Sequence, residues 1–261
     1  MGDSMDHDRI VPLSGINNLR DYGGYGVAGG GRVKRGVLWR SGQHVMASDA
    51  DLETIGALGL ATVIDLRGGS ERAANPCRRP EGFAAAVIAC EGDTAGLASH
   101  LDAGAGVMDE HGARSAMCAL YAGMPWRENL VTVLRGYLRA LADREGASLI
   151  HCYAGKDRTG FAVALAHHVL GVHPDDALAD YLLTNVATQG RHIPGRPASD
   201  QQHYAGLSEG AMQALQGVHE SYLAAAFAAL RERHGSVDAY LGEVLGVDAA
   251  LAERIRAALL D

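Results

Sequence analysis

Short apolar runs alternate along the chain with longer stretches in which apolar residues recur every three or four positions. Four short runs are typical of buried strands and lie at 36–41, 61–67, 83–90 and 148–152. Stretches with helical spacing lie between and after them, at 48–60, 128–143, 159–171 and 174–186. Because strands alternate with helices over the first two thirds of the chain, the pattern predicts an α/β fold with a central, mostly parallel sheet and flanking helices.

The last third of the chain has a helical pattern without further strand-like runs. Extra C-terminal helices are expected at about 209–234, 236–245 and 248–260. Residues 1–30 are interpreted as glycine-rich loop, and residues 95–123 have only weak helical patterning. No repeat or convincing boundary divides the chain, so residues 1–261 are interpreted as a single domain. The segment around 188–215 begins with a long loop-like stretch, which is typical either of a lid or of a surface excursion.

Composition narrows the classes of function without selecting one. The 261 residues carry a formal net charge of −8, which argues against broad binding to nucleic acid or to a membrane surface. No stretch approaches the ~18 consecutive apolar residues of a membrane span, and the N-terminal run MGDSMDHDRI lacks the apolar core of a signal peptide. We therefore expect a cytoplasmic protein by default, with signal-independent secretion as the alternative.

The four cysteines do not form a metal or disulfide pattern. They are Cys77, Cys90, Cys118 and Cys152, and no two of them form a CxxC pair. A zinc site is therefore not indicated, and neither a metal nor an organic cofactor is expected. Cys77, Cys90 and Cys118 are interpreted as ordinary thiols, with a protective disulfide to Cys152 on oxidation as the alternative.

The sequence HCYAGKDRTG at 151–160 places a cysteine and three charged residues between a predicted strand and a predicted helix. Such a loop lies at the carboxyl edge of a parallel sheet, where ligands bind. Gly155 allows the backbone to curl so that several N–H groups face one point, and the helix N-terminus also attracts anions. Arg158 adds a planar set of donors that suits phosphate, and the same positive field favours a thiolate at Cys152. The loop therefore predicts a phosphate site with a nucleophile beneath it.

In this interpretation Cys152 attacks phosphorus, Arg158 and the loop amides stabilise the phosphoryl oxygens, and Thr159 stabilises the departing thiolate. The expected substrate-binding residues are Tyr153, Ala154, Gly155, Lys156, Thr159 and Gly160. His151 is expected to order the loop. One alternative is that Cys152 is merely a buried core residue. A nucleotide loop of the form GxxxxGK[ST] is disfavoured, because Ile150 stands where the first glycine is needed and Asp157 follows Lys156.

This loop resembles the HCxxGxxR[ST] signature of cysteine-dependent protein tyrosine phosphatases. Its GKDRTG form is similar to a bacterial group that includes secreted mycobacterial and listerial enzymes acting on phosphotyrosine and phosphoinositides. Five further segments resemble that group in the expected order: NNLRDYGGY (17–25), GVLWRSG (36–42), TVIDLR (62–67), DYLLTN (180–185) and HGSVDAYLGEVLGV (234–247).

The resemblance implies a tyrosine-phosphatase-like fold that hydrolyses phosphate monoesters through a phosphocysteine intermediate. A phosphotyrosine protein or a phosphoinositide is the substrate that it implies, and a helical lid is implied near 188–207. Three other functions stay open. They are an inositol phosphate or phosphoinositide phosphatase with the same chemistry, a catalytically inactive phosphate-binding module, and a rhodanese-like sulfur transferase, whose loop usually lacks the arginine and threonine found here.

The residue that protonates the leaving group is not fixed by the sequence. Many tyrosine phosphatases carry this acid in a Trp-Pro-Asp run, which is missing here; the run MPWRE (124–128) is interpreted as the entry to a helix. Asp157 lies inside the loop, Asp65 ends a strand at the sheet rim, and Asp93 follows the third strand. Each also has a structural alternative: Asp157 tethers a loop cation, Asp65 pairs with Arg67, or Asp93 is a solvated turn residue.

Several basic residues outside the catalytic set are candidates for substrate binding. Lys156 is expected to favour dianionic or multiply phosphorylated substrates, or else to be solvated at the loop rim. Arg40 either reaches the site or forms a structural ion pair, and Arg20 with Asp21 is expected to be structural. The loop residues Arg191, His192 and Arg196 would suit a phosphorylated substrate.

Overall fold

A five-stranded sheet forms the centre of the computed structural model, which describes residues 7–94, 109–143, 145–188 and 207–261. The strands are β1 (Arg20–Asp21), β2 (Leu38–Ser41), β3 (Leu60–Asp65), β4 (Ala86–Ile88) and β5 (Ala147–His151). Their order is β1-β2-β5-β3-β4, in which β1 is antiparallel to β2 and the remaining neighbours are parallel. The predicted α/β fold with a mostly parallel sheet is confirmed.

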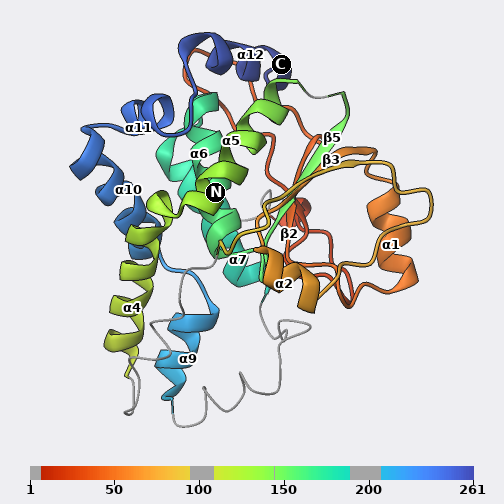
Figure 1. The fold of residues 1–261 in the computed structure, drawn as a ribbon, viewed down its shortest axis with the longest axis horizontal. Coiled ribbons are helices and arrows are strands. Elements are labelled where there is room, and N and C mark those ends of the chain that lie inside the picture. The colour runs from red at the N-terminus through yellow and green to blue at the C-terminus, as the bar shows by residue number, and fades with distance from the viewer. Residues whose placement is uncertain (1–6, 95–108, 144, 189–206) are drawn as a thin grey trace.

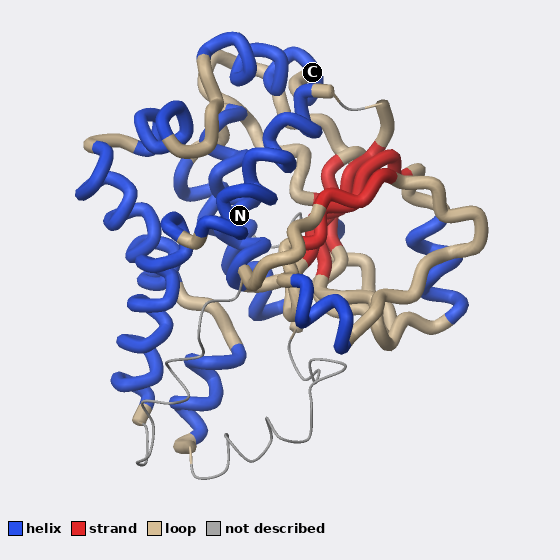
Figure 2. Tube along the Cα trace, in the orientation of Figure 1, coloured by secondary structure: helices blue, strands red, loops and turns tan. Residues whose placement is uncertain are grey.

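Helices cover both faces of this sheet (Figures 1 and 2). The chain before the loop at 151–160, which we call the phosphate loop, contributes η1 (His7–Arg9), α1 (Asp49–Gly56), α2 (Gly69–Ala74), α4 (Glu110–Gly123), η2 (Met124–Trp126) and α5 (Glu128–Ala142). The chain after it contributes α6 (Asp157–Leu170), α7 (Pro174–Ala187), α9 (Glu209–Gln216), α10 (Glu220–His234), α11 (Val237–Glu243) and α12 (Ala249–Leu259). The expected flanking and C-terminal helices are therefore present.

Successive residues of the central strands enter two different cores. Val63 of β3 and Leu149 of β5 pack with α1 and the N-terminal loop, whereas Ile64 and Ile150 belong to the larger core that includes α5 and α6. All four side chains have at most 1% of their surface exposed. Because side chains alternate between the two faces of a strand, apolar runs without polar interruption are what a sheet covered on both faces requires.

The structure corrects several predicted boundaries. The helix expected at 209–234 is two helices, because Gly217 ends α9 in an extended conformation and the His219 side chain caps α10. The strand expected at 83–90 is only three residues long, and the helix expected at 48–60 ends at Gly56, before Gly59 at φ +63° leads into β3. The glycine-rich N-terminal segment contains β1. Part of the segment at 95–123 is the helix α4, whereas residues 95–108 lie outside the described residues.

The lid expected around 188–215 falls mostly outside the described residues, which omit 189–206 and with them Arg191, His192 and Arg196. The described part of that segment contains most of α9. The lid therefore stays a prediction. None of the helices in the described ranges is long and apolar enough to span a membrane.

A buried ion-pair network ties the helix α7 to the sheet beside the phosphate loop. The Asp180 carboxylate lies 3.3 Å from Nε of Arg20 and 2.8 Å from Nη1 of Arg40, and all three side chains are buried almost completely. Burial alone would raise the pKa of Asp180, but the two arginines hold it well below its usual range. Arg20 is therefore structural, as predicted, and Asp21 accepts hydrogen bonds from the backbone N–H groups of Gly23 and Gly36.

We expect Asp180→Asn to lower the free energy of unfolding by about 3–5 kcal/mol, because it leaves two buried arginines without a counter-charge. Urea titration followed by circular dichroism measures the change. Asp176→Asn is the matched control, since Asp176 is exposed on the same helix, and we expect a change within about 0.5 kcal/mol. Equal stabilities for the two variants would contradict the structural role of Asp180.

Candidate active site

The phosphate loop lies where the carboxyl ends of three parallel strands meet. His151 of β5 is paired with Ser41 of β2 on one side and with Asp65 of β3 on the other, and Cys152 follows directly. The helix α6 begins at Asp157, two residues earlier than the predicted start at Thr159. No side chain of the described residues caps its N-terminus. The orphan N–H groups of that first turn are thus available to an anion.

Gly155 gives the loop its tight curve. It adopts φ +70°, and a Cβ atom there would lie 2.3 Å from the carbonyl oxygen of Ser41, so only glycine fits. The Gly155 carbonyl is held in place by two donors, Nδ2 of Asn18 at 2.8 Å and Nη2 of Arg40 at 3.1 Å. Arg40 therefore forms a structural ion pair and also reaches the loop, so the two alternatives that the sequence left open both apply.

The remaining residues of the loop are anchored by their backbone. The Tyr153 carbonyl accepts a hydrogen bond from the N–H of Gln43 at 3.0 Å, and Ala154 packs close to Gly42. Gly160 continues α6, since its N–H donates to the carbonyl of Lys156 at 2.8 Å. The predicted binding residues thus run from the turn after β5, at Tyr153 to Lys156, into the first turns of α6, at Thr159 and Gly160.

Arg158 is oriented by an acidic side chain that the sequence analysis did not single out. Its Nη1 and Nη2 atoms donate to the two carboxylate oxygens of Glu71 on α2, at 2.5 and 2.8 Å. Nη1 also lies 2.9 Å from the Thr94 hydroxyl and 3.2 Å from the Leu66 carbonyl. Nε forms no hydrogen bond with a described residue, so the edge of the guanidinium formed by Nε and the second N–H of Nη2 keeps its donors for bidentate phosphate binding.

Charge pairing fixes the protonation states of Arg158 and Glu71. Burial lowers the pKa of Arg158, but its hydrogen bonds to Glu71 and the nearby Cys152 and Asp157 raise the pKa above its ordinary value. Burial likewise raises the pKa of Glu71, and the hydrogen bonds and charge of Arg158 outweigh this and lower it. The pair is therefore ionised at neutral pH.

Cys152 has only 3% of its surface exposed and stands at the bottom of the loop. The neighbouring His151 contacts the Cys152 carbonyl through Nδ1 at 3.3 Å and stacks on His44 with ring centroids 5.4 Å apart. Burial, as the largest cause, lowers the pKa of His151 to about 4, so the ring is neutral at pH 7. The Thr159 hydroxyl is buried and has no hydrogen-bond partner in the described part of the chain.

Asp157 is held by two groups that converge on one of its oxygens. Oδ1 accepts hydrogen bonds from the Tyr121 hydroxyl at 2.8 Å and from Nζ of Lys156 at 2.9 Å. Tyr121 in turn accepts from the Tyr181 hydroxyl at 2.8 Å, and both tyrosines are buried. Oδ2 has no partner among the described residues, and the side chain is 23% exposed. The carboxylate is thus fixed through Oδ1, and Oδ2 keeps its lone pairs free of protein donors among the described residues.

The two other acid candidates lie in different surroundings. Asp65 forms a bidentate ion pair with Arg67, at 2.9 Å to Nε and 2.7 Å to Nη2. Burial raises the pKa of Asp65, but His151 and Arg67 lower it to about 2, so Asp65 carries no proton at neutral pH. This geometry favours the structural alternative for Asp65. Asp93 is exposed and accepts from the Ser70 hydroxyl at 2.5 Å, beside the Thr94 that contacts Arg158.

One group of side chains near the loop has the composition of a metal site. The ligand atoms of Asp65, Cys77 and His151 lie within 4.8 Å of one another. Nη2 of Arg67 already donates to Asp65 and, at 3.1 Å, to the Cys77 sulfur, so a guanidinium occupies the position a cation would take. We therefore assign no metal to this group. Cys77, Cys90, Cys118 and Cys152 are all free thiols.

Arg127, between η2 and α5, is a second residue near the site that sequence reasoning missed. Its guanidinium donates to the Leu120 carbonyl at 3.2 Å and lies near the Thr94 carbonyl at 3.5 Å. The pKa of Arg127 is lowered, mainly by burial and next by the positive charge of Arg158, while the negative charge of Asp157 acts in the opposite direction. Arg127 is therefore close enough to interact electrostatically with both residues. The run MPWRE does form a helix entry, as predicted.

Fold and loop together define an α/β protein with an uncapped helix N-terminus and a buried arginine at the carboxyl edge of its sheet. A sequence model described as "Tyrosine phosphatase family" matches residues 11–261, so the chain belongs to that family. It is 38% identical over 240 residues to a Cupriavidus necator protein provisionally named a tyrosine-protein phosphatase, covering 90% of this chain and 84% of that protein. It is 29% identical over 285 residues to the "Triple specificity protein phosphatase PtpB" of Mycobacterium tuberculosis, covering 96% and 99%.

A shorter match, 33% identical over 115 residues, is to a tyrosine-protein phosphatase of Nostoc commune and covers 41% of this chain and 37% of that protein. The predicted membership of the bacterial tyrosine phosphatases is confirmed, and with it the class of enzyme, a phosphatase.

We expect Glu71→Gln to reduce kcat/KM on p-nitrophenyl phosphate by about tenfold or more, because the carboxylate holds Arg158 through two charge-assisted hydrogen bonds. Steady-state kinetics on the folded variant measures the loss. Glu53→Gln on the exposed face of α1 is the control and should leave the rate unchanged. A Glu71→Gln enzyme with the wild-type rate would mean that Arg158 is oriented without this ion pair.

Proposed function

We propose that this protein is a protein tyrosine phosphatase that hydrolyses phosphate monoesters through a phosphocysteine intermediate at Cys152. The observation that carries the proposal is the placement of a single cysteine directly after β5, one short loop before the uncapped N-terminus of α6 and in the electrostatic field of Arg158. A phosphate group bound by that helix end and by Arg158 would lie over the sulfur.

The reaction has two displacement steps. In the first, the Cys152 thiolate attacks phosphorus, an S–P bond forms, and the P–O bond to the leaving group breaks while an acid protonates the leaving oxygen. In the second, water attacks phosphorus, the S–P bond breaks, and the same residue accepts a proton from water. Arg158 and the amides at the start of α6 stabilise the phosphoryl oxygens in both steps, and the unpartnered Thr159 hydroxyl is assigned to the departing thiolate.

Asp157 is the proposed acid. Its Oδ1 is held by Tyr121 and Lys156, which leaves the partially exposed Oδ2 to carry the proton toward the leaving oxygen. Asp65 is left out of this mechanism because Arg67 occupies both of its oxygens. Asp93 is the second candidate, since it lies on the exposed loop beside Thr94.

A phosphoinositide or inositol phosphate is the second substrate class, and two further cations near the loop favour it. Nζ of Lys156 bonds to Asp157 and lies 3.3 Å from the Gly217 carbonyl, so the side chain is buried beside Asp157 and is not solvated at the loop rim. Arg127 stands in the field of Arg158. A second phosphate on one substrate would find donors in these two residues, and the broad specificity named for PtpB is consistent with such a site.

We expect wild type to hydrolyse p-nitrophenyl phosphate with chelator present and Cys152→Ser to be inactive, because the serine hydroxyl is not ionised at neutral pH. A phosphotyrosine peptide, a phosphoserine peptide and phosphoinositide vesicles then rank the substrate classes. Cys118→Ser is the control thiol variant. Rapid quenching in denaturant with ³²P-labelled substrate should trap an S-linked phosphoenzyme that is more stable in alkali than in acid. Phosphate binding without turnover would instead identify an inactive phosphate-binding module.

We expect Asp157→Asn to reduce kcat on a phosphotyrosine peptide by about 100-fold or more and to have a smaller effect on p-nitrophenyl phosphate, whose leaving group needs less protonation. A larger loss of kcat on the peptide than on p-nitrophenyl phosphate indicates that an acid has been removed, whereas equal losses on both substrates indicate general damage to the loop. Asp93→Asn and Asp65→Asn serve as parallel variants. If Asp93→Asn shows the leaving-group dependence and Asp157→Asn does not, Asp93 is the acid.

A further inference from the structure

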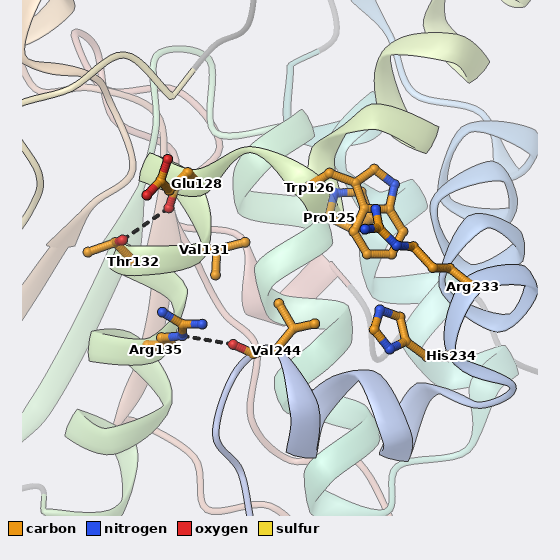
Figure 3. A pocket seen from close by; sticks show the side chains of 9 residues that line it. All are labelled: Pro125, Trp126, Glu128, Val131, Thr132, Arg135, Arg233, His234 and Val244. Carbon is orange, nitrogen blue, oxygen red and sulfur yellow. Dashed lines mark hydrogen bonds between the residues drawn. The ribbon is translucent and has the colours of Figure 1, made fainter.

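A surface pocket of about 370 Å³ lies where η2 and α5 meet the C-terminal end of α10, and it contains none of the residues assigned to catalysis. Its volume is within the roughly 300–1,000 Å³ of small-molecule sites. Trp126, Val131 and Val244 give it an apolar lining. Figure 3 shows Arg135 on one side of the pocket and Arg233 on the other, so two cations border an apolar surface.

The two arginines are oriented but not neutralised. The guanidinium carbon of Arg233 lies 4.5 Å from the centre of the Trp126 ring, and Nε of Arg135 donates to the Val244 carbonyl at 2.7 Å. Within the described ranges no carboxylate forms an ion pair with either arginine, although the chain carries a net charge of −8. Their remaining N–H donors are thus free to bind a ligand.

No acid near the pocket forms an ion pair with either arginine among the described residues, although Glu128 itself lines the pocket (Figure 3). Glu243 is paired with Nδ1 of His234 at 2.5 Å, and the His234 ring stacks on Trp126 with centroids 5.5 Å apart. The Glu128 side chain points away from Arg135 in Figure 3. Two unpaired guanidinium groups beside an aromatic ring and two valines are therefore the groups that a ligand would contact.

We propose that this pocket binds a small organic anion in which a carboxylate is attached to a flat apolar group. The carboxylate pairs with the guanidinium of Arg233 or Arg135, which present donors in the planar arrangement that suits it. The flat group packs on Val131, Val244 and the edge of Trp126. This site is separate from the phosphatase site, so it needs neither Cys152 nor Arg158.

Benzoate is the probe, and its uncharged analogue benzamide tests the need for charge. The chain has two tryptophans, so Trp39→Phe leaves Trp126 as the single reporter. We expect benzoate to change the Trp126 emission saturably and benzamide to bind at least about tenfold more weakly, because charge-assisted hydrogen bonds are lost. An absent or unsaturable change with benzoate, or equal binding of the two compounds, would overturn the proposal.

Arginine variants in the same Trp39→Phe background locate the site. We expect Arg233→Gln to weaken benzoate binding by about tenfold or more. Arg231→Gln is the matched control, because Arg231 is exposed on the same helix, lies over Phe227 and does not line the pocket. Arg135→Gln should weaken binding likewise, but Arg233→Gln decides, since Arg135 also supports the Val244 carbonyl. Equal affinities in the Arg233 and Arg231 variants, with thermal melts unchanged, would show that benzoate binds elsewhere.

Discussion

The buried carboxylate of Asp180 is the interaction on which the position of the phosphate loop depends. It neutralises Arg20 and Arg40, and Arg40 in turn holds the carbonyl of Gly155. Three buried charges are costly unless each has its partner in place, so the network tolerates little displacement. The two side chains that bind the Gly155 carbonyl come from 115 and 137 positions earlier in the chain. The curve of the loop is therefore imposed by the sheet and its ion pairs as well as by glycine.

Local sequence patterns were sufficient to predict the features of this protein that depend on neighbouring residues. The parallel sheet follows from apolar runs and helical spacing, and the position of the phosphate loop follows from Cys152, Gly155 and Arg158 between a strand and a helix. Glu71 could not be predicted, because it acts through a contact with Arg158 that joins residues 87 positions apart. The break between α9 and α10 could not be predicted for a related reason. The Asn185 side chain donates to the carbonyl of Val218 and accepts from its N–H, and the spacing of apolar residues gives no sign of such a distant contact.

The cations of the loop are paired with acids before any substrate binds. Arg158 is matched by Glu71 and Lys156 by Asp157, so each pair is close to neutral when viewed from a distance. These partners nevertheless leave specific donors free, because Glu71 contacts only the Nη atoms of Arg158. The pairs thus set the direction of the free N–H groups. A dianionic phosphate is then recognised by its geometry more than by a broad positive field.

This arrangement is consistent with an acidic protein that acts on anions. A net charge of −8 does not attract a phosphorylated substrate over long distances, and salt screens such attraction beyond roughly 8–10 Å. In the proposed mechanism, binding therefore comes from contacts within the loop, where the helix N-terminus, Arg158 and the buried Lys156 would lie close to the phosphate. Because these contacts act over a few ångströms, the site selects a phosphate group that can reach the bottom of the loop. Since Cys152 is only 3% exposed, the proposed mechanism requires an ester that carries its phosphate deep enough to reach the sulfur, and this requirement would select substrates more strongly than their charge.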